Sequence, residues 1–294
     1  MPPAPRTSVI IPARNADAFL PFQLEALAAQ DHRGGWEVVV VDHRSSDRTG
    51  AVAAAYADRL PALRVQRTDR RGGANTARND GARVAHGELL VFCDADDVAD
   101  AGWLSAMVAA AADADVVAGR LDTRRLNDER SRRWRFDDDA DLDVTDVARI
   151  GFLPYAPAGN VVVRAEVLWA LGGFPEGYRR GCDEMALMWR AQRAGYRFAV
   201  APTALMHYRL SDRLGVLARQ HFGYRAMEAK LYREFRDAGM PRSNTRAALS
   251  QWWALGRGVG DLFASAERRG VWLRIAASSA GRAWGSVRNR VVYL

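Results

Sequence analysis

Short apolar runs alternate with helical patterns over the first third of the chain. The β-branched run 8–12, the valine-rich run 36–42, the short segment 63–66 and the apolar run 89–93 each have the length of a strand. The segments between them carry apolar residues at helical spacing, as in 19–30, or polar caps followed by Ala-rich stretches. This alternation predicts an α/β fold with a Rossmann-like, mostly parallel sheet and helices on both of its faces.

The run at 89–93 leads into the densest group of candidate functional residues, because its carboxyl end carries Asp94, Asp96 and Asp97. Ligands of open α/β sheets bind beyond the strand ends, and Asp94 and Asp96 point the same way on an extended backbone. Hard oxygen ligands at this place suit Mg²⁺ or Mn²⁺ shared with a substrate phosphate. The alternative is a solvated acidic turn that caps the next helix.

The first two strands deliver Pro12 and Asp42 to the same edge of the sheet, and Asn15 follows in the first turn. A shared edge of this kind predicts a binding cleft. No Gly-x-Gly-x-x-Gly stands at a strand-to-helix turn, and the first turn carries Pro12 instead, which disfavours dinucleotide binding.

Four motifs in this part of the chain carry a family resemblance. They are, in order, Ser8-Val-Ile-Ile-Pro-x-x-Asn, Val-Val-Val-Asp42 with a Ser-x-Asp-x-Thr turn, Gly73-x-x-x-Ala-Arg-Asn-x-Gly, and Phe92-Cys-Asp-Ala-Asp-Asp. Their order and intervals resemble the nucleotide-sugar half of the family 2 inverting glycosyltransferases of bacterial type, which have the GT-A fold. Four linked motifs are a specific signal, whereas any one of them would be weak.

The resemblance implies roles for the residues of these motifs. Pro12, Asn15 and Asp42 would line the nucleoside pocket, with Asp42 accepting a hydrogen bond from the base. Asp94 would lie near the ribose or the donor sugar, and Asp96 would bind the divalent cation, Mn²⁺ or Mg²⁺.

Three more residues are expected at the donor. Arg71 or Arg78 would lie near the base or the phosphates, and Asn160, which opens a strand at 160–164, is assigned to the same site. His43 stands where the family often has a second acid, which leaves the base and ribose preference open. We expect a UDP-sugar.

An acidic pair, Asp183 and Glu184, opens a helix that follows Gly181 and Cys182. The helix dipole and capping favour acids in a first turn, so a structural role is one reading. The related enzymes have a Glu-Asp pair here, followed by Leu, Arg and Gly-Tyr at the intervals that this chain repeats. The order of the pair is reversed in this chain, and the register implies Glu184 as general base, with Asp183 as the alternative.

His207 follows another short strand, at 197–200. Similar enzymes place a histidine here that reaches the diphosphate or the metal, so the resemblance implies a metal contact; a structural histidine is the alternative.

Residues 120–146 are highly charged and are expected to form an irregular loop, which borders the acceptor in related enzymes.

The positive charge of the chain is concentrated in its last part. The formal net charge is +7, yet residues 205–294 hold 16 Lys or Arg against 6 Asp or Glu, and the first 204 residues hold 26 against 29. Helices are expected at 214–235 and from Pro241 to about Arg269, with a last amphipathic segment around Trp272 and Trp284. We therefore divide the chain into a catalytic domain, 1–208, and a helical basic extension, 209–294.

The aromatic residues of this extension are expected mostly in the core. Trp at the edge of an Arg-rich helix is also typical of a lipid interface, so peripheral contact with an anionic membrane is a second hypothesis.

Cys93 and Cys182 lie in no metal-binding spacing. No signal peptide and no run of about 18 apolar residues is found. We expect a cytoplasmic protein, with contact at the inner face of the membrane as an option, and no nucleic-acid partner.

These expectations combine into one function. The chain is predicted to be a metal-dependent inverting glycosyltransferase that moves a sugar from a nucleoside-diphosphate sugar to a hydroxyl by single displacement. The acceptor would be a saccharide, a lipid-linked glycan or a secondary metabolite, as in the synthesis of cell-surface polysaccharides. A nucleotidyltransferase and a nucleotide-sugar-binding protein with weak or no catalysis remain as alternatives.

Overall fold

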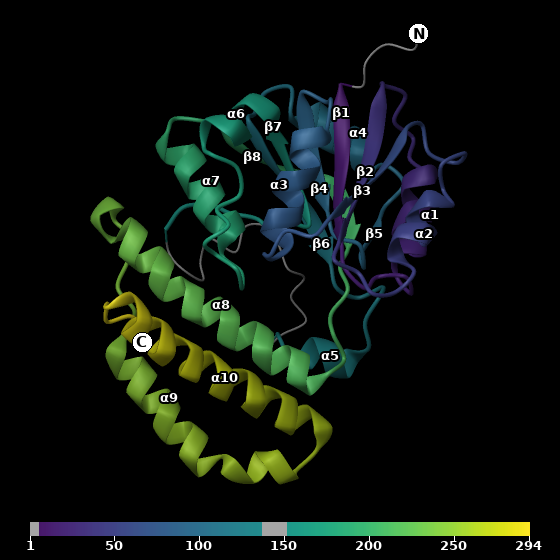
Figure 1. The fold of residues 1–294 in the computed structure, drawn as a ribbon. Coiled ribbons are helices and arrows are strands. Elements are labelled where there is room, and N and C mark those ends of the chain that lie inside the picture. Colours follow the sequence, from purple (N-terminus) through teal and green to yellow (C-terminus); the bar gives the residue numbers. More distant parts are fainter. Residues whose placement is uncertain (1–5, 137–151) are drawn as a thin grey trace.

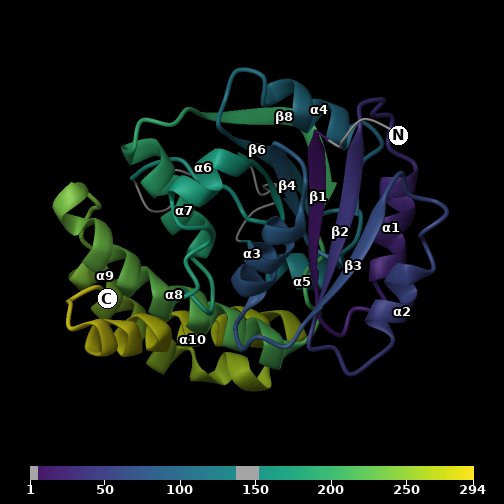
Figure 2. The ribbon, with the colours of Figure 1, turned by 45° about the horizontal axis from the view of Figure 1, so that its top comes forward.

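A mixed sheet of eight strands forms the centre of the protein in the computed structural model, which describes residues 6–136 and 152–294. Its strands, in spatial order, are β3 (Leu63–Thr68), β2 (Trp36–His43), β1 (Thr7–Ala13), β4 (Leu89–Cys93), β7 (Asn160–Arg164), β6 (Val116–Asp122), β8 (Phe198–His207) and β5 (Val98–Ala99). The curled sheet with helices on both sides is visible in Figures 1 and 2.

The first four strands pair in parallel, as the sequence predicts, and Val38 to Val41 of β2 are fully buried between the two helical layers. Strand β7 departs from this pattern, because it runs antiparallel to both β4 and β6. Among the described residues, β6 pairs in parallel with β8, and β5 closes the edge in antiparallel. The α/β class is confirmed, and the second half of the sheet is mixed.

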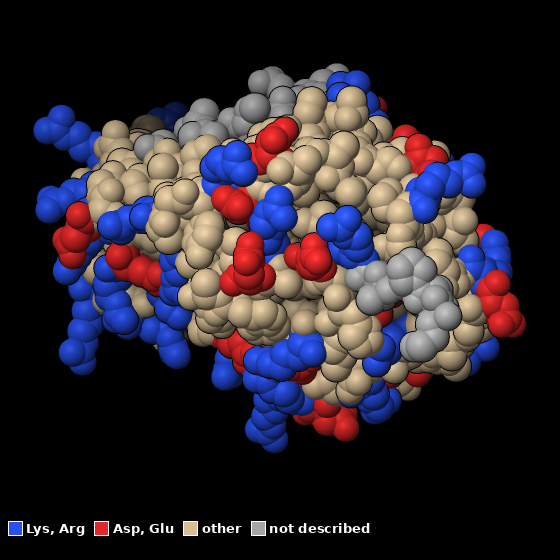
Figure 3. Space-filling view, turned by 90° about the horizontal axis from the view of Figure 1, so that it is seen from above, with Lys and Arg blue, Asp and Glu red and all other residues tan. Residues whose placement is uncertain are grey.

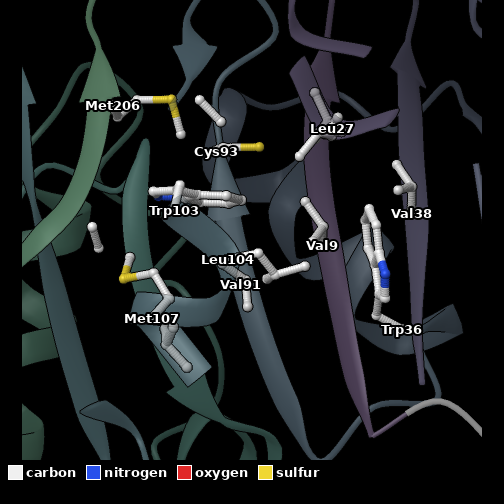
Figure 4. Close-up of a cluster of buried hydrophobic side chains, with 14 of the residues drawn as sticks. Val9, Leu27, Trp36, Val38, Val91, Cys93, Trp103, Leu104, Met107 and Met206 are labelled. Carbon is white, nitrogen blue, oxygen red and sulfur yellow. The ribbon is translucent and has the colours of Figure 1, made fainter. Parts of the chain in front are cut away.

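Two hydrophobic layers hold helices against the sheet. One face carries α1 (Leu20–Ala28), α2 (Thr49–Ala54) and α4 (Trp103–Ala110), and the other carries α3 (Ala74–Val84), α6 (Ala165–Ala170) and α7 (Asp183–Arg193). Figure 4 shows the first layer, where Val9, Val38 and Val91 from neighbouring strands and Trp103 and Met107 from α4 contribute to one cluster. Both layers are needed because the strands are apolar on both faces.

The C-terminal part is helical, as predicted. It consists of α8 (Leu214–Phe235), η2 (Arg236–Ala238), α9 (Thr245–Arg257), η3 (Val259–Phe263) and α10 (Ala266–Asn289). The bounds expected for α8 are confirmed. The expectation of one helix to about Arg269 is wrong, because the chain breaks at Gly258 and a new helix begins after the N-cap Ser265, whose Oγ accepts from the amide of Arg268.

Helices α8 and α10 pack at very close range along their length (Figure 1). A Cβ added at Gly281 would lie 2.3 Å from the carbonyl oxygen of Phe222, and one at Gly285 would lie 2.4 Å from that of Ala226. Only glycine allows such an approach of two helix backbones. Helix α9 lies outside this pair, and Trp252, Trp253 and Trp284 are exposed. Phe263 is exposed as well, so these four aromatic residues do not lie in the core, where most aromatic residues of the extension were expected.

The stretch predicted to be irregular contains ordered structure in its described part. Strand β6 continues to Asp122, and α5 (Glu129–Arg133) begins at Asp128, whose side chain accepts from the amide of Ser131 at 2.7 Å. Trp134 follows and is buried, and its indole donates to the carbonyl of Ala266 at the start of α10. The remainder of the predicted loop lies outside the described residues.

Charges are mixed on the sheet-bearing part of the protein. The face seen from above in Figure 3 shows Lys and Arg interspersed with Asp and Glu. Within residues 6–136 and 152–294, no helix has both the length and the apolar character that a bilayer span requires.

Candidate active site

A cavity of about 1240 Å³ opens between the carboxyl ends of β1 and β4 and the helices α7 and α8. Of the residues predicted for the site, it is lined by Pro12, Asn15, Arg78, Asp94, Asp96, Asp183 and Glu184. The structure thus brings together the strand-end aspartates and the acidic pair of α7, which are far apart in the sequence.

The acidic loop after β4 is held from both sides. Gln23 of α1 is buried, and its Oε1 accepts from the amide of Ala99 at 2.8 Å. The segment after β8 holds the loop from the other side, where the amide of Arg209 donates to Asp97 and its guanidinium donates to the carbonyl of Asp96. These bonds fix the direction of the loop and leave the Asp96 carboxylate exposed towards the cavity.

The two aspartates at the end of this loop differ in environment. The surrounding protein partly removes the Asp96 carboxyl from water, and Asp94 adds a negative charge beside it. Desolvation first, and then the charge of Asp94, raise the pKa of Asp96 to about 6. Asp97 is fully buried, and its burial, followed by Asp94 and Asp96, raises its pKa well above the usual range. The position of Asp97 indicates a structural role, because one oxygen anchors Arg209 and neither faces the cavity.

Arg78 connects the two acidic groups of the site. Its Nη2 donates to Oδ1 of Asp94 at 2.6 Å, and its Nη1 lies 3.6 Å from Oδ2 of Asp183. The side chain is buried, and its guanidinium also lies over the ring of Phe174. A buried guanidinium between two carboxylates keeps both in the cavity wall and offsets their mutual repulsion.

Helix α3 also positions the loop that precedes α7. The Nδ2 of Asn75 donates to the carbonyl of Tyr178 at 3.1 Å, and Asn79 exchanges two hydrogen bonds with the backbone of Phe174. This explains why the motif around Gly73 matters to the site, since its polar side chains hold the segment that carries the acidic pair.

The acidic pair lies in the first turn of α7. Cys182 before it has a left-handed backbone, with φ of 65°, which turns the chain into the helix. Burial, and then the charge of Asp183, raise the pKa of Glu184 to about 8, although the helix N-terminus favours the ionised form. Burial also raises the pKa of Asp183, and Arg78 opposes this rise. Glu184 can therefore take up a proton near neutral pH.

Four of the predicted site residues do not line the cavity: Asp42, Arg71, Asn160 and His207. Asp42 is buried at the end of β2, where it accepts from the amide of Ser45 and pairs with Arg67 at 3.3 Å. Arg71 is exposed. Asp42 therefore shapes the turn that contains Ser45. This turn holds Asn15, whose backbone amide donates a hydrogen bond to the Ser45 hydroxyl.

Asn160 and His207 have their polar atoms occupied within the protein. Asn160 is fully buried, accepts from the indole of Trp103 at 2.7 Å and donates to backbone carbonyls of β6 and β8. His207 is buried between Asp122, at 2.7 Å, and Arg125, at 2.9 Å. Both polar atoms of Asn160 therefore have partners inside the sheet, and both ring nitrogens of His207 lie within hydrogen-bond distance of neighbouring side chains.

A metal ion here would depend on the donor for most of its ligands. Within the described residues, no group of three or more His, Cys, Asp or Glu side chains is placed to hold a metal. Mg²⁺ and Mn²⁺ are commonly held by one or two carboxylates together with substrate phosphates, and the exposed carboxylate of Asp96 fits that mode. The hard oxygen atoms present are therefore compatible with a divalent cation shared with a diphosphate.

Several lining residues were not predicted from the sequence. They come from the loop before α7, from the segment that leads into α8 and from α8 itself, and they include Tyr178, Arg179, Arg180, Arg213, Arg219 and Tyr224. Their only sequence signal was the position of two arginines next to the acidic pair. The cavity is lined by residues from both sides of residue 208, the proposed end of the catalytic domain. The division at this residue stays a prediction.

The fold and the cavity together define a GT-A-like α/β protein. Residues 8–172 match the family model for Glycosyl transferase family 2, and the chain belongs to this family. It is 29% identical over 202 residues to Glycosyltransferase AglE of Haloferax volcanii, covering 67% of this chain and 64% of that protein. It is 40% identical over 107 residues to Validoxylamine A glucosyltransferase of Streptomyces hygroscopicus subsp. limoneus, covering 36% and 24%. The chain thus spans less than two thirds of these relatives.

Solved structures share the fold over most of the chain. The mannosyltransferase PcManGT from Pyrobaculum calidifontis, in complex with GDP-Man and Mn²⁺, has a TM-score of 0.66 at 23% identity and covers 96% of this chain and 88% of that one. S. aureus TarS 1-349 in complex with UDP has a TM-score of 0.56 at 20% identity, covering 96% and 91%. At this level of identity, the likeness concerns the fold alone.

Proposed function

We propose that the protein is a metal-dependent inverting glycosyltransferase that uses a nucleoside-diphosphate sugar and a hydroxyl acceptor. The observation that carries this proposal is that Asp94, Asp96 and Glu184 line one cavity, in which Arg78 pairs with Asp94 and lies 3.6 Å from Asp183. Membership of Glycosyl transferase family 2 supports it, as do fold neighbours that bind GDP-Man with Mn²⁺ and UDP.

The reaction would be a single displacement. The acceptor hydroxyl oxygen attacks the anomeric carbon of the donor sugar while the carboxylate of Glu184 takes the hydroxyl proton. The bond between that carbon and the diphosphate oxygen breaks, and the nucleoside diphosphate leaves with the bonding electrons. Attack opposite to the leaving group inverts the anomeric configuration. A base with a pKa of about 8 is well matched to this proton transfer.

The cavity wall supplies the remaining roles. Asp96 would hold Mn²⁺ or Mg²⁺, which when bound offsets the charge that builds on the leaving diphosphate. Asp94, fixed by Arg78, would orient the donor sugar, while Pro12 and Asn15 would form the nucleoside wall. We propose UDP as the nucleotide, and the hydroxyl of a saccharide, lipid-linked glycan or metabolite as the acceptor.

Calorimetric titration with UDP, GDP and dTDP, each with Mn²⁺ and with EDTA, tests the donor site. We expect one nucleotide to bind with Mn²⁺ and to lose most of its affinity in EDTA. Asp96→Asn should lose the same metal-dependent part, while Asp69→Asn, at an exposed acid outside the cavity, should bind as the parent does. Equal binding by the Asp96 variant would remove the metal role.

The stereochemical course is tested separately. With the donor so identified, ¹H NMR of the freshly released sugar reports its anomeric configuration. We expect the configuration opposite to that of the donor, and retention would contradict single displacement. Release of pyrophosphate instead of sugar would identify a nucleotidyltransferase.

A further inference from the structure

The outer surface of α9, η3 and α10 exposes large apolar side chains. Phe263 is 86% exposed, Val287 is 76% exposed and Trp253 is 65% exposed. We call this surface the hairpin face, and its apolar members are Leu249, Trp252, Trp253, Val259, Phe263, Trp284 and Val287, with Val292 just after α10. Large apolar side chains exposed in this number on helices that contact one another are typical of an interaction surface rather than of a solvated one.

Arginines accompany these apolar residues. On α9, Arg246, Leu249, Trp253 and Arg257 follow one another at helical spacing, so they share one side of the helix. The guanidinium of Arg257 lies 4.5 Å from the centre of the Trp253 ring. On α10, Arg288 adjoins Val287 and is exposed as well.

The charge of this region is strongly one-sided. Residues 241–294 contain nine arginines and two acids, Asp261 and Glu267, a net of +7. The two acids are paired with Arg268 and Arg133. Within the described parts of the chain, Arg246 and Arg288 have no carboxylate at salt-bridge distance. The charge on the hairpin face is therefore available to an anionic partner.

We propose that the hairpin face binds the surface of an anionic lipid bilayer. Its Trp and Phe side chains would enter the interfacial region, and its arginines would lie among the lipid phosphates. Charge complementarity favours this partner over a second copy of the chain. A two-fold contact through the same face would set arginines against arginines, and like charges oppose association.

This proposal places the cavity close to the lipid. Val216, Arg219 and Tyr224 of α8 line the cavity, while Gly281 and Gly285 of α10 pack directly on the same helix. Helix α10, which carries part of the hairpin face, therefore packs directly on the helix that lines the cavity. The inference that the acceptor is lipid-linked rests on the proposed function, whereas membrane binding itself can be measured without any activity.

Co-sedimentation with extruded vesicles tests the binding. We expect the full chain to sediment with vesicles of phosphatidylcholine containing about 30 mol% phosphatidylglycerol at about 50 mM salt, and to be largely released at about 300 mM salt. It should not sediment with phosphatidylcholine alone. Failure to bind the anionic vesicles at low salt would overturn the proposal.

Matched variants identify the surface. Trp253→Ser combined with Phe263→Ser should weaken the partition coefficient about tenfold or more, and Arg246→Glu combined with Arg288→Glu about 25-fold or more. The controls are Phe22→Ser and Arg33→Glu, which change exposed residues outside the hairpin face and should bind as the parent does. Circular dichroism melting confirms that each variant is folded.

Two outcomes would overturn the assignment of the surface. One is vesicle binding that the hairpin variants leave unchanged or that the control variants weaken equally. The other is a dimer in sedimentation velocity without lipid that Trp253→Ser dissociates, because the hairpin face would then be an interface between two copies of the chain.

Discussion

The Nη2 atom of Arg78 lies 2.6 Å from Oδ1 of Asp94, and the pair joins the loop after β4 to helix α3. The same guanidinium is 3.6 Å from Asp183, so one side chain of α3 contacts both acidic groups of the site. Asp94 and Asp183 come from different parts of the chain, and the Arg78 guanidinium holds both. The relative position of the two acidic groups in the cavity therefore depends on Arg78.

Replacement of Arg78 by Met should lower the free energy of unfolding by about 3 kcal/mol. The change leaves Asp183 buried without its counter-charge, and breaking a buried ion pair from one side is costly. Urea unfolding measures the loss. Arg71→Met is the matched control, since Arg71 is exposed on the neighbouring loop, and its change should stay within about 0.5 kcal/mol. An equal free energy of unfolding in both variants would mean that the Arg78 ion pairs do not stabilise the folded protein.

Glu184→Gln should reduce the rate of sugar release by about 10²- to 10⁴-fold, since it removes the general base. The donor should bind to this variant as before. In the parent protein, the base works only when ionised, so kcat/KM should rise with pH through an apparent pKa of about 8.

Asp183→Asn separates the roles of the two acids. The charge of Asp183 contributes to the raised pKa of Glu184, so its removal should move the rising limb of the pH profile to lower pH and leave substantial activity. Should Asp183→Asn prove more damaging than Glu184→Gln at every pH, the base assignment would have to be reversed.

The raised pKa of Glu184 also makes stability depend on pH. In the unfolded chain this carboxyl has a pKa near 4.5, and in the folded protein it is about 8, so between these values the folded state holds the extra proton. The stability from this group is fully present below pH 4.5 and is lost as the pH rises towards 8. Urea unfolding from pH 5 to 8 should show a shallower decline for Glu184→Gln than for the parent, and identical slopes would contradict the shift.

The sequence predicts those parts of this protein that local patterns determine. The buried valines of β2 and the apolar period of α8 define elements whose bounds agree with the structure. The pairing of β7 in antiparallel was not foreseen, because a strand of five residues carries no signal for its neighbours. Similarly, the amphipathic pattern of α9 does not say whether its apolar side is covered, and Trp253 is exposed.

The candidate site was predicted in the same uneven way. The sequence motifs predicted Asp96 and Glu184 as site residues, and both line the cavity. They also predicted Asn160, whose side chain forms its hydrogen bonds inside the protein. The double contact of Arg78 was not predictable from spacing, because its partners come from other elements of the fold. Residue type and local motif therefore identify candidates, and only tertiary contacts separate residues that face the ligand from those that support them.

Gly159 offers a steric test of the position of Asp94. A Cβ at this buried glycine would lie 2.6 Å from Oδ2 of Asp94, and Arg78 holds the other oxygen of that carboxylate. Gly159→Ala should therefore push Asp94 from its place and lower kcat/KM for the donor by about 10- to 100-fold, since small displacements at a reacting centre are costly. Gly260→Ala is the control, because a Cβ there meets no atom within 4 Å. Unchanged kinetics in a folded Gly159→Ala protein would show that the position of Asp94 does not govern the reaction.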